Sequence, residues 1–258
     1  MTADETRARV QNSVDFDFAG ASVAITGGTS GIGYALAMAF LSSGAEVTVT
    51  GTRPAAADYD TDLSSFSYSQ VQMREPSTID AFTASLERLD VLVNNAGANF
   101  PDGKDEWEPD VFASALELNL GGPMRCSSGC RRLLAASGLE GGGSIVNLVS
   151  MSAFRSVPFV PGYSAAKAGL ASLTANMAKH WYRHGIRVNA VAPGVIDTPM
   201  TEPMAAFPEL LEAELARTVT GRLGRADEIV GAVQFLASSA ASFITGTTLV
   251  VDGGYQLY

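Results

Sequence analysis

The stretch Ser22-Val-Ala-Ile-Thr-Gly-Gly-Thr-Ser-Gly-Ile-Gly33 decides how this chain folds. Its first five residues are mostly apolar or β-branched, and they predict a short buried strand. Glycines follow at 27, 31 and 33, and the composition of Ile32 to Leu41 predicts a helix that ends at Gly44. Glu46 to Thr50 predicts a second strand. A strand, a glycine-rich turn, a helix and a strand within about 30 residues are typical of a dinucleotide-binding βαβ unit.

The glycines of this turn have a physical role in such a unit. They permit a tight turn and let the backbone approach a pyrophosphate at the helix N-terminus, where partial positive charge lies. The spacing here is G-x-x-x-G-x-G, not the commoner G-x-G-x-x-G. A glycine cluster alone is as often a plain strand–helix turn as a nucleotide site.

The remaining chain alternates strand and helix patterns. Further strands are predicted near 68–73, 89–93, 144–149, 186–191 and 247–251, and helices near 79–89, 112–120, 163–184 and 226–236. This alternation predicts an α/β fold, a doubly wound parallel sheet of the Rossmann type with helices on both faces, in a single domain over 18–258. We expect residues 1–17, which are polar and acidic, to be a flexible leader.

Composition excludes several classes of protein. The 258 residues include 27 acidic and 17 basic side chains, a net charge of −10, which argues against nucleic-acid binding. No apolar run is long enough to span a bilayer, so we expect a cytoplasmic protein. Cys126 and Cys130 are one helical turn apart and predict neither a disulfide framework nor a metal site. His180 and His184 lack the intervening Glu of a metalloprotease motif, and we expect no metal.

A second motif carries chemistry. Ser150 ends the predicted strand at 144–149, and Tyr163 and Lys167 share one face of the following helix because they are four residues apart. A neighbouring ammonium favours the phenolate of a tyrosine, so we expect Lys167 to lower the pKa of Tyr163. Ser150 can donate a hydrogen bond to a substrate oxygen. A lone Y-x-x-x-K is most often a plain pair on a helix surface.

Several motifs together resemble the short-chain dehydrogenase/reductase family, in its single-domain form, over nearly the whole chain. The matching segments are T-G-x-x-x-G-I-G at 26–33, N-N-A-G at 94–97, Y-x-x-x-K at 163–167 with a serine 13 residues earlier, P-G-x-x-x-T at 193–198 and Asp252-Gly-Gly254. The resemblance implies an oxidoreductase that moves a hydride between nicotinamide C4 and a carbonyl or secondary alcohol. The Y-x-x-x-K interval separates the chain from relatives that reduce carbon–carbon double bonds, which use a longer spacing.

The resemblance also implies site residues. The catalytic residues would be Asn119, Ser150, Tyr163 and Lys167, with Tyr163 transferring the proton, Lys167 binding the nicotinamide ribose and Asn119 bending its helix and holding a water beside Lys167. The implied cofactor-binding residues are Gly27, Thr29, Ser30, Gly31, Ile32, Gly33, Thr52, Arg53, Gln72, Met73, Asn95, Ala96, Gly97, Tyr163, Lys167, Pro193, Gly194, Ile196 and Thr198.

The end of the second strand favours NADP(H) over NAD(H). NAD-binding proteins carry a carboxylate about 20 residues beyond the glycines, which binds the ribose hydroxyl and repels a 2′-phosphate. This chain has Gly51 there, followed by Thr52 and Arg53, which can contact a phosphate. Two points keep NAD(H) open: Ser30 stands where many NADP-preferring relatives carry a basic residue, and Arg53 can be a plain surface residue.

The substrate is less defined. Residues expected to face it are mostly apolar and favour a hydrophobic carbonyl or alcohol: Phe100, Ser152, Phe159, Met200 and Met204, with Ala98, Asn99, Phe154, Gly162 and Val195 near them. We interpret 199–218 as a mobile lid, with an ordinary amphipathic helix as the alternative. A 3-oxoacyl-carrier-protein reductase is the second candidate, for which Arg131, Arg132, Lys179 and Arg183 could form a docking face.

Two further expectations rest on analogy. Helices around 103–120 and 123–137 commonly form the first dimer interface in this family, so we expect a homo-oligomer, a dimer or a tetramer. A dinucleotide-binding sensor or scaffold without catalysis is the remaining alternative. It is disfavoured because all four implied catalytic residues are present.

Overall fold

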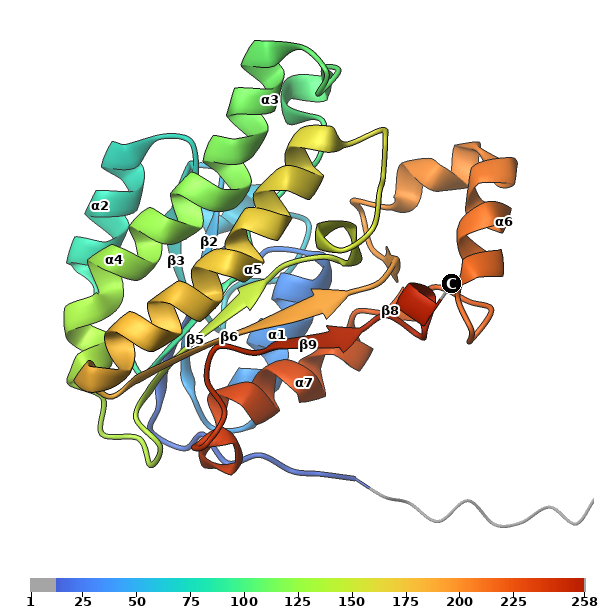
Figure 1. The fold of residues 1–258 in the computed structure, drawn as a ribbon. Coiled ribbons are helices and arrows are strands. Elements are labelled where there is room, and N and C mark those ends of the chain that lie inside the picture. The colour runs from blue at the N-terminus through green and yellow to red at the C-terminus, as the bar shows by residue number, and fades with distance from the viewer. Residues whose placement is uncertain (1–12, 258) are drawn as a thin grey trace, which may run out of the picture.

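A seven-stranded parallel sheet forms the centre of the protein. The computed structural model describes residues 13–257, and its main sheet has the strand order β3-β2-β1-β4-β5-β6-β9 (Figure 1). The strands of this sheet are β1 Ser22–Ile25, β2 Glu46–Gly51, β3 Ser67–Gln70, β4 Val91–Asn94, β5 Gly143–Leu148, β6 Ile186–Pro193 and β9 Thr248–Val251. A separate parallel ladder pairs β7 Ile196–Asp197 with β8 Gly224–Arg225.

Helices cover both faces of the sheet (Figure 1). They are α1 Gly31–Ser42, α2 Pro76–Ser85, α3 Pro109–Leu116, α4 Gly122–Ala135, α5 Pro161–Trp181, α6 Pro208–Arg217 and α7 Asp227–Ala237. Phe40 of α1 and Ile229 of α7 belong to the core on one face, and Ile79 of α2, Cys130 of α4 and Met177 of α5 to the core on the other. The predicted doubly wound α/β fold is confirmed.

The topology places a crevice above the middle of the sheet. From β1 the chain runs outward through β2 and β3, and it then returns to β4 on the other side of β1. The connections after β1 and β4 therefore leave on opposite sides, which opens a crevice at the carboxyl ends of the strands. Every residue of β5 and β6 is buried, as expected for parallel strands covered on both faces.

Several element boundaries differ from those predicted. β3 ends at Gln70 instead of Met73, because the chain turns at Gln72, whose carbonyl accepts the Glu75 amide at 2.8 Å. α2 begins at Pro76, whose fixed φ suits the first helical position. The short ladder of β7 and β8 was not predicted, since two residues carry no alternation pattern.

Of the expected leader, only residues 13–17 lie within the described part of the chain. Phe16 there packs against the core, and Phe18 is buried against Phe40, with ring centroids 4.8 Å apart. Among residues 13–257, no helix combines the length and the apolar character needed to cross a membrane.

Candidate active site

A cavity of about 490 Å³ lies at the carboxyl ends of the strands. Its wall contains the glycine-rich turn after β1 and residues that follow β2, β3, β4, β5 and β6. Of the predicted cofactor-binding residues, all but Arg53 line it, and so do Ser150, Tyr163 and Lys167. The sequence motifs therefore converge on one cavity.

The glycine-rich turn is held by the segment after β4. The Asn95 side-chain amide donates hydrogen bonds to the carbonyls of Thr26 and Gly27, both at 3.0 Å, and the Thr26 hydroxyl accepts the Ala96 amide at 3.0 Å. Gly27 has φ +64° and Gly31 has φ +51°, values that suit glycine. Backbone is thus exposed at the N-terminus of α1, a surface that fits a pyrophosphate.

Gly97 ends the N-N-A-G segment close to Asn119 and to Lys167 on α5. A Cβ at this position would lie 2.7 Å from Asn119 Oδ1 and 3.2 Å from Lys167 Nζ. Glycine is therefore required for the close approach of the segment after β4 to α5, and the cavity remains open at that point.

Tyr163 and Lys167 lie one turn apart at the start of α5, as predicted. Lys167 Nζ lies 5.4 Å from the Tyr163 ring centroid and donates a hydrogen bond to the Leu148 carbonyl at 2.7 Å. Ser150, two residues beyond the end of β5, faces the phenol and hydrogen-bonds to it. A hydroxyl, a phenol and an amine thus meet on the cavity wall, an arrangement that can hold an oxygen atom and exchange a proton with it.

The direction of the Tyr163 pKa shift is opposite to the one expected from the sequence. Burial raises the pKa of Tyr163 to about 12, outweighing the lowering by the hydrogen bond from Ser150. Burial also lowers the pKa of Lys167 to about 8. The desolvation of both groups therefore dominates over the attraction of the ammonium for a phenolate, and the phenol is the favoured form at neutral pH.

Asn119 lies in a π-helical turn, Glu117–Gly121, between α3 and α4. Its buried side chain donates to the carbonyls of Ala98 and Ala115, at 2.9 and 3.0 Å, and accepts the Ala98 amide at 3.2 Å. Asn119 itself does not line the cavity, but it fixes the segment after Gly97 against the helix.

Comparison with known proteins is consistent with this geometry. A sequence family described as "Enoyl-(Acyl carrier protein) reductase" matches residues 27–256. Galactitol 2-dehydrogenase (L-tagatose-forming) from Cereibacter sphaeroides is 35% identical, over 94% of this chain and 98% of the relative. A 3alpha-hydroxysteroid dehydrogenase from Mediterraneibacter gnavus is 34% identical, over 89% and 94%. A solved structure of a putative 2-deoxy-d-gluconate 3-dehydrogenase from Agrobacterium tumefaciens with bound NADP has a TM-score of 0.81 at 32% identity, over 95% of this chain and all of that one.

This chain belongs to the short-chain dehydrogenase/reductase family. It is accordingly an NAD(P)-dependent oxidoreductase of the kind that acts on CH–OH and C=O groups. The family description names an enoyl reductase, whereas the two curated relatives are named as dehydrogenases.

The end of β2 differs from the sequence prediction for this short-chain dehydrogenase/reductase. Arg53 does not line the cavity: its guanidinium donates to the Asp58 carbonyl and lies over the Tyr59 ring, 4.8 Å from the centroid. Tyr59 lines the cavity in its place, and its hydroxyl accepts the Arg53 amide at 2.9 Å. A side chain at Gly51 would collide with that hydroxyl.

The predicted substrate residues divide into two groups. Phe100 and Met200 line the cavity, as do Ala98 and Asn99. The other three do not: Ser152 is buried with its hydroxyl unpaired among the described residues, Phe159 is 64% exposed, and Met204 is partly buried away from the wall. Ser152 and Met204 lie in short 3₁₀ turns and Phe159 lies in a loop, where spacing along the chain does not fix the direction of a side chain.

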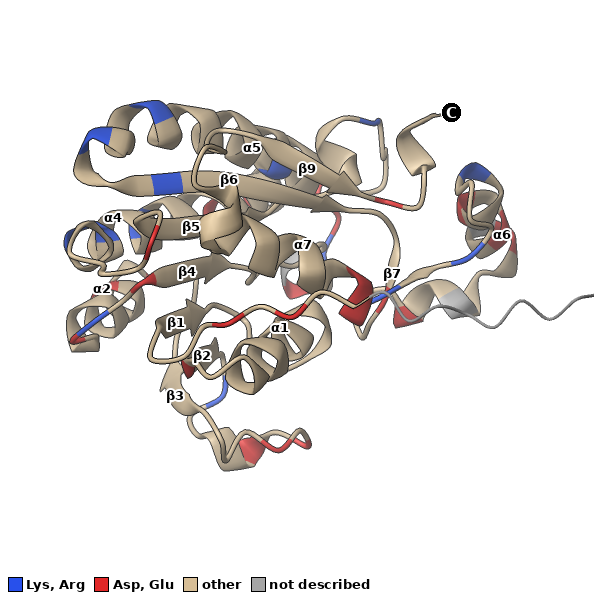
Figure 2. Ribbon diagram, turned by 90° about the horizontal axis from the view of Figure 1, so that it is seen from below, with Lys and Arg blue, Asp and Glu red and all other residues tan. Residues whose placement is uncertain are grey.

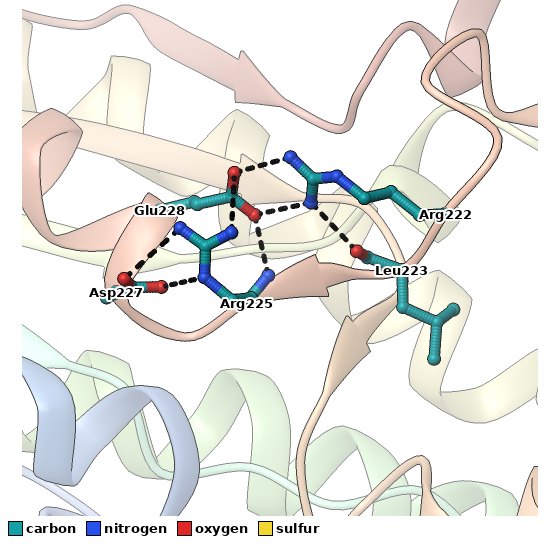
Figure 3. Close-up of polar contacts among 5 residues, drawn as sticks. All are labelled: Arg222, Leu223, Arg225, Asp227 and Glu228. Carbon is teal, nitrogen blue, oxygen red and sulfur yellow. Dashed lines mark hydrogen bonds and ion pairs between the residues drawn. The ribbon is translucent and has the colours of Figure 1, made fainter.

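The segment 199–218, expected to be a lid, lies between two short strands that pair with each other, so its two ends are close together. It follows β7, contains α6 and returns through β8, which pairs with β7. Figure 3 shows ion pairs at this base: Arg222 donates two hydrogen bonds to Glu228, at 2.7 and 2.8 Å, and Arg225 pairs with Asp227 at 3.0 Å. The hydrogen bonds from Arg222 lower the pKa of Glu228 to about 2.

Four residues at or beside the cavity were not predicted from the sequence. Tyr59 and Arg74 line the cavity, and Arg74 forms a two-pronged ion pair with Asp102, at 2.8 and 3.0 Å. Glu106 is buried and contacts the start of α5. All four come from irregular or acidic segments, and an aromatic residue in an otherwise polar connection is the one signal that could have marked Tyr59.

Proposed function

We propose that this protein reduces a hydrophobic carbonyl compound with NADPH, and catalyses the reverse reaction at high pH, with Tyr163 as the proton donor. The observation that carries the proposal is the meeting of Ser150, Tyr163 and Lys167 on the wall of the cavity that also contains the glycine-rich turn. When bound, the dinucleotide supplies the hydride.

The residues of the chain have distinct tasks in this proposal. Ser150 donates a hydrogen bond to the substrate oxygen and orients it toward Tyr163. Tyr163, protonated at neutral pH because burial raises its pKa to about 12, gives its proton to that oxygen. Lys167, which donates a hydrogen bond to the Leu148 carbonyl, binds a ribose hydroxyl in this proposal and keeps positive charge near the phenol. The link from Lys167 to solvent through a water at Asn119 remains a prediction.

The cofactor preference follows from the space around β2. No carboxylate ends this strand, and the Tyr59 hydroxyl fills the space in which a side chain at 51 would reach a ribose. Ser30, Thr52 and Tyr59 line the cavity, and each carries a hydroxyl that can donate to a phosphate. The related structure from Agrobacterium tumefaciens contains NADP. These points favour NADPH.

The substrate side of the cavity favours an apolar molecule. Phe100 and Met200 form part of its wall, and both are large, apolar and partly exposed. Nearby, the exposed ring of Trp107 donates to the Pro158 carbonyl at 2.9 Å, beside the exposed Phe159. Aromatic surfaces of this kind suit a hydrophobic substrate better than a polyol.

The carrier-protein reductase is less well supported by the position of the basic residues. Arg131 and Arg132 lie in the last part of α4, and Lys179 lies in the last turn of α5, 16 residues beyond Tyr163. That distance corresponds to about 24 Å along a helix. Figure 2 shows Lys and Arg at the ends of α4 and α5 on the opposite side of the molecule from α6. The expected docking face is therefore not at the cavity mouth.

We also propose that the protein self-associates and that it is cytoplasmic. β9 is an edge strand of the main sheet, and Val250 on it is exposed, so an apolar sheet edge is available to a second copy of the chain. A dimer or tetramer is expected, and light scattering of the purified protein tests it.

NADPH consumption at 340 nm with a panel of carbonyl compounds tests the proposed function. Hydrophobic cyclic ketones should be reduced faster than keto sugars and acetoacetyl thioesters. Faster turnover of the thioester would favour the carrier-protein reductase. Tight NADPH binding without reduction of any carbonyl would favour a sensor and contradict the proposal.

A further inference from the structure

Glu106 is a buried carboxylate beside the candidate active site. Its side chain is 0% exposed, whereas the neighbouring Asp105 and Glu108 are exposed. Oε1 accepts a hydrogen bond from the Phe100 amide and Oε2 one from the Tyr163 amide, each at 2.8 Å. A buried carboxylate is unfavourable unless it is paired, and here two backbone amides satisfy it.

The two amides belong to different parts of the site. Phe100 lines the cavity and has φ +46°, a conformation that a residue with a side chain adopts only when its surroundings hold it. Tyr163 lies in the first turn of α5, where the partial positive charge of the helix N-terminus favours an anion. One side chain thus holds both a wall residue and the proton donor.

We propose that Glu106 is a positioning residue that couples the cavity wall at Phe100 to the proton donor Tyr163. This inference rests on the proposed function of Tyr163. Close packing around the contact leaves little freedom for adjustment, because a Cβ at Gly162 would lie 3.2 Å from Glu106 Oε2 and 2.8 Å from the Ala115 side chain. The carboxylate therefore sets where α5 begins relative to the segment 98–106.

The charge of Glu106 also acts on the phenol. Beside burial, the negative charge of Glu106 raises the pKa of Tyr163. The other groups that face the phenol are the Ser150 hydroxyl, after β5, and the Lys167 amine, on α5 itself. The π-helical turn also packs against α5, and its Asn119 is neutral and bonds to Ala98 and Ala115. Removing the charge should thus make the phenol more acidic.

The test compares Glu106→Gln with Glu108→Gln, a matched control whose parent side chain is exposed and makes no capping hydrogen bond. Glu106→Gln keeps one acceptor oxygen but loses the charge and one of the two hydrogen bonds. We expect kcat to fall by about tenfold to a hundredfold, because Tyr163 would no longer be held in its position for proton transfer. KM for NADPH should not change, and the pH limb of alcohol oxidation should move down by about one unit. A purely structural role would leave that limb in place.

Glu106→Asp provides a second variant in case the amide variant does not fold. It keeps the charge but is too short to reach both amides, so kcat should fall while the pH limb stays at the parent value. Parent-like kcat and pH profile in either folded variant would overturn the inference.

Should the parent itself reduce no carbonyl compound, the proposed function fails instead. Amide hydrogen exchange then decides the coupling: Phe100 and Tyr163 should both exchange faster in Glu106→Gln than in Glu108→Gln, and unchanged exchange would overturn it.

Discussion

The amine of Lys167 lies over the ring of Tyr163, 5.4 Å from its centroid, and its hydrogen bond goes to the main chain at Leu148. Both side chains are buried, and burial disfavours the charged form of each. The pair is consequently a neutral phenol beside an amine that loses its proton near pH 8, an arrangement suited to giving a proton to a substrate oxygen at neutral pH.

The pH dependence of reduction should report Lys167. Its pKa is lowered to about 8, so the ammonium is present below that pH and lost above it, while Tyr163 remains protonated throughout this range. We expect kcat/KM for carbonyl reduction to be flat from about pH 6 to 8 and to fall above, because kcat/KM follows the groups of the free enzyme. In Lys167→Met the residual rate should lack this limb. A limb that persists in the variant would assign it to another group.

Substitution of Gly51 by Asp should fail to convert the cofactor preference. The Tyr59 hydroxyl occupies the space of the new side chain, so Gly51→Asp should lower the melting temperature and weaken binding of both NADPH and NADH. Adding Tyr59→Ala should restore stability and favour NADH, a strongly non-additive result for two residues in contact. Tyr59→Phe, which removes only the hydroxyl, is the control. Fluorescence titration with each dinucleotide measures the affinities, and simple additivity would argue against the steric explanation.

The ion pairs at the base of the expected lid should appear in the acid stability of the protein. The pKa of Glu228 is lowered to about 2, so its contribution is present above its ordinary pKa of 4.5 and is lost as the pH falls toward 2. Glu228→Gln should therefore melt below the parent at pH 7, and the two should converge between about pH 4.5 and 2. Calorimetry over this range measures the difference. Equal melting temperatures at pH 7 would mean that these surface pairs contribute nothing.

A buried arginine away from the active site should matter for folding. Arg187 on β6 is 1% exposed and donates to five main-chain carbonyls, of Gly141, Leu236, Ala237, Ser238 and Ala241. Arg187→Met removes all five hydrogen bonds and leaves the Gly141 and Ala237 carbonyls without a side-chain donor, so it should lower the free energy of unfolding by about 3 kcal/mol or more. Urea denaturation measures this, with the exposed Arg183→Met as control. A loss as small as that of the control would contradict the structural role.

The features that could be predicted from the sequence are those that depend on short, regular spacing between residues. The glycine turn at 27–33 and the pair Tyr163 and Lys167 could be placed because a strand end and a helical turn fix their geometry. Asn119 was assigned from its position in the family pattern, and the structure adds the π-helical turn around it.

What could not be predicted depends on contacts between distant or irregular segments. Arg53 was expected at the cofactor; in the structure its guanidinium lies over the ring of Tyr59, and Tyr59 lines the cavity. Nothing in the acidic run from Asp102 to Glu108 distinguishes Glu106, because only the packing of α5 against that segment buries it. The pKa of Tyr163 likewise depends on burial, which the spacing to Lys167 does not reveal.

The rate of a single turnover by Tyr163→Phe tests the central claim most directly. The variant keeps the ring but lacks the proton, so NADPH should bind with the parent affinity while carbonyl reduction slows by about 10²–10⁴-fold. Rapid-mixing absorbance at 340 nm with parent and variant gives both quantities. Reduction by Tyr163→Phe at the rate of the parent would contradict the assignment of Tyr163 as the proton donor.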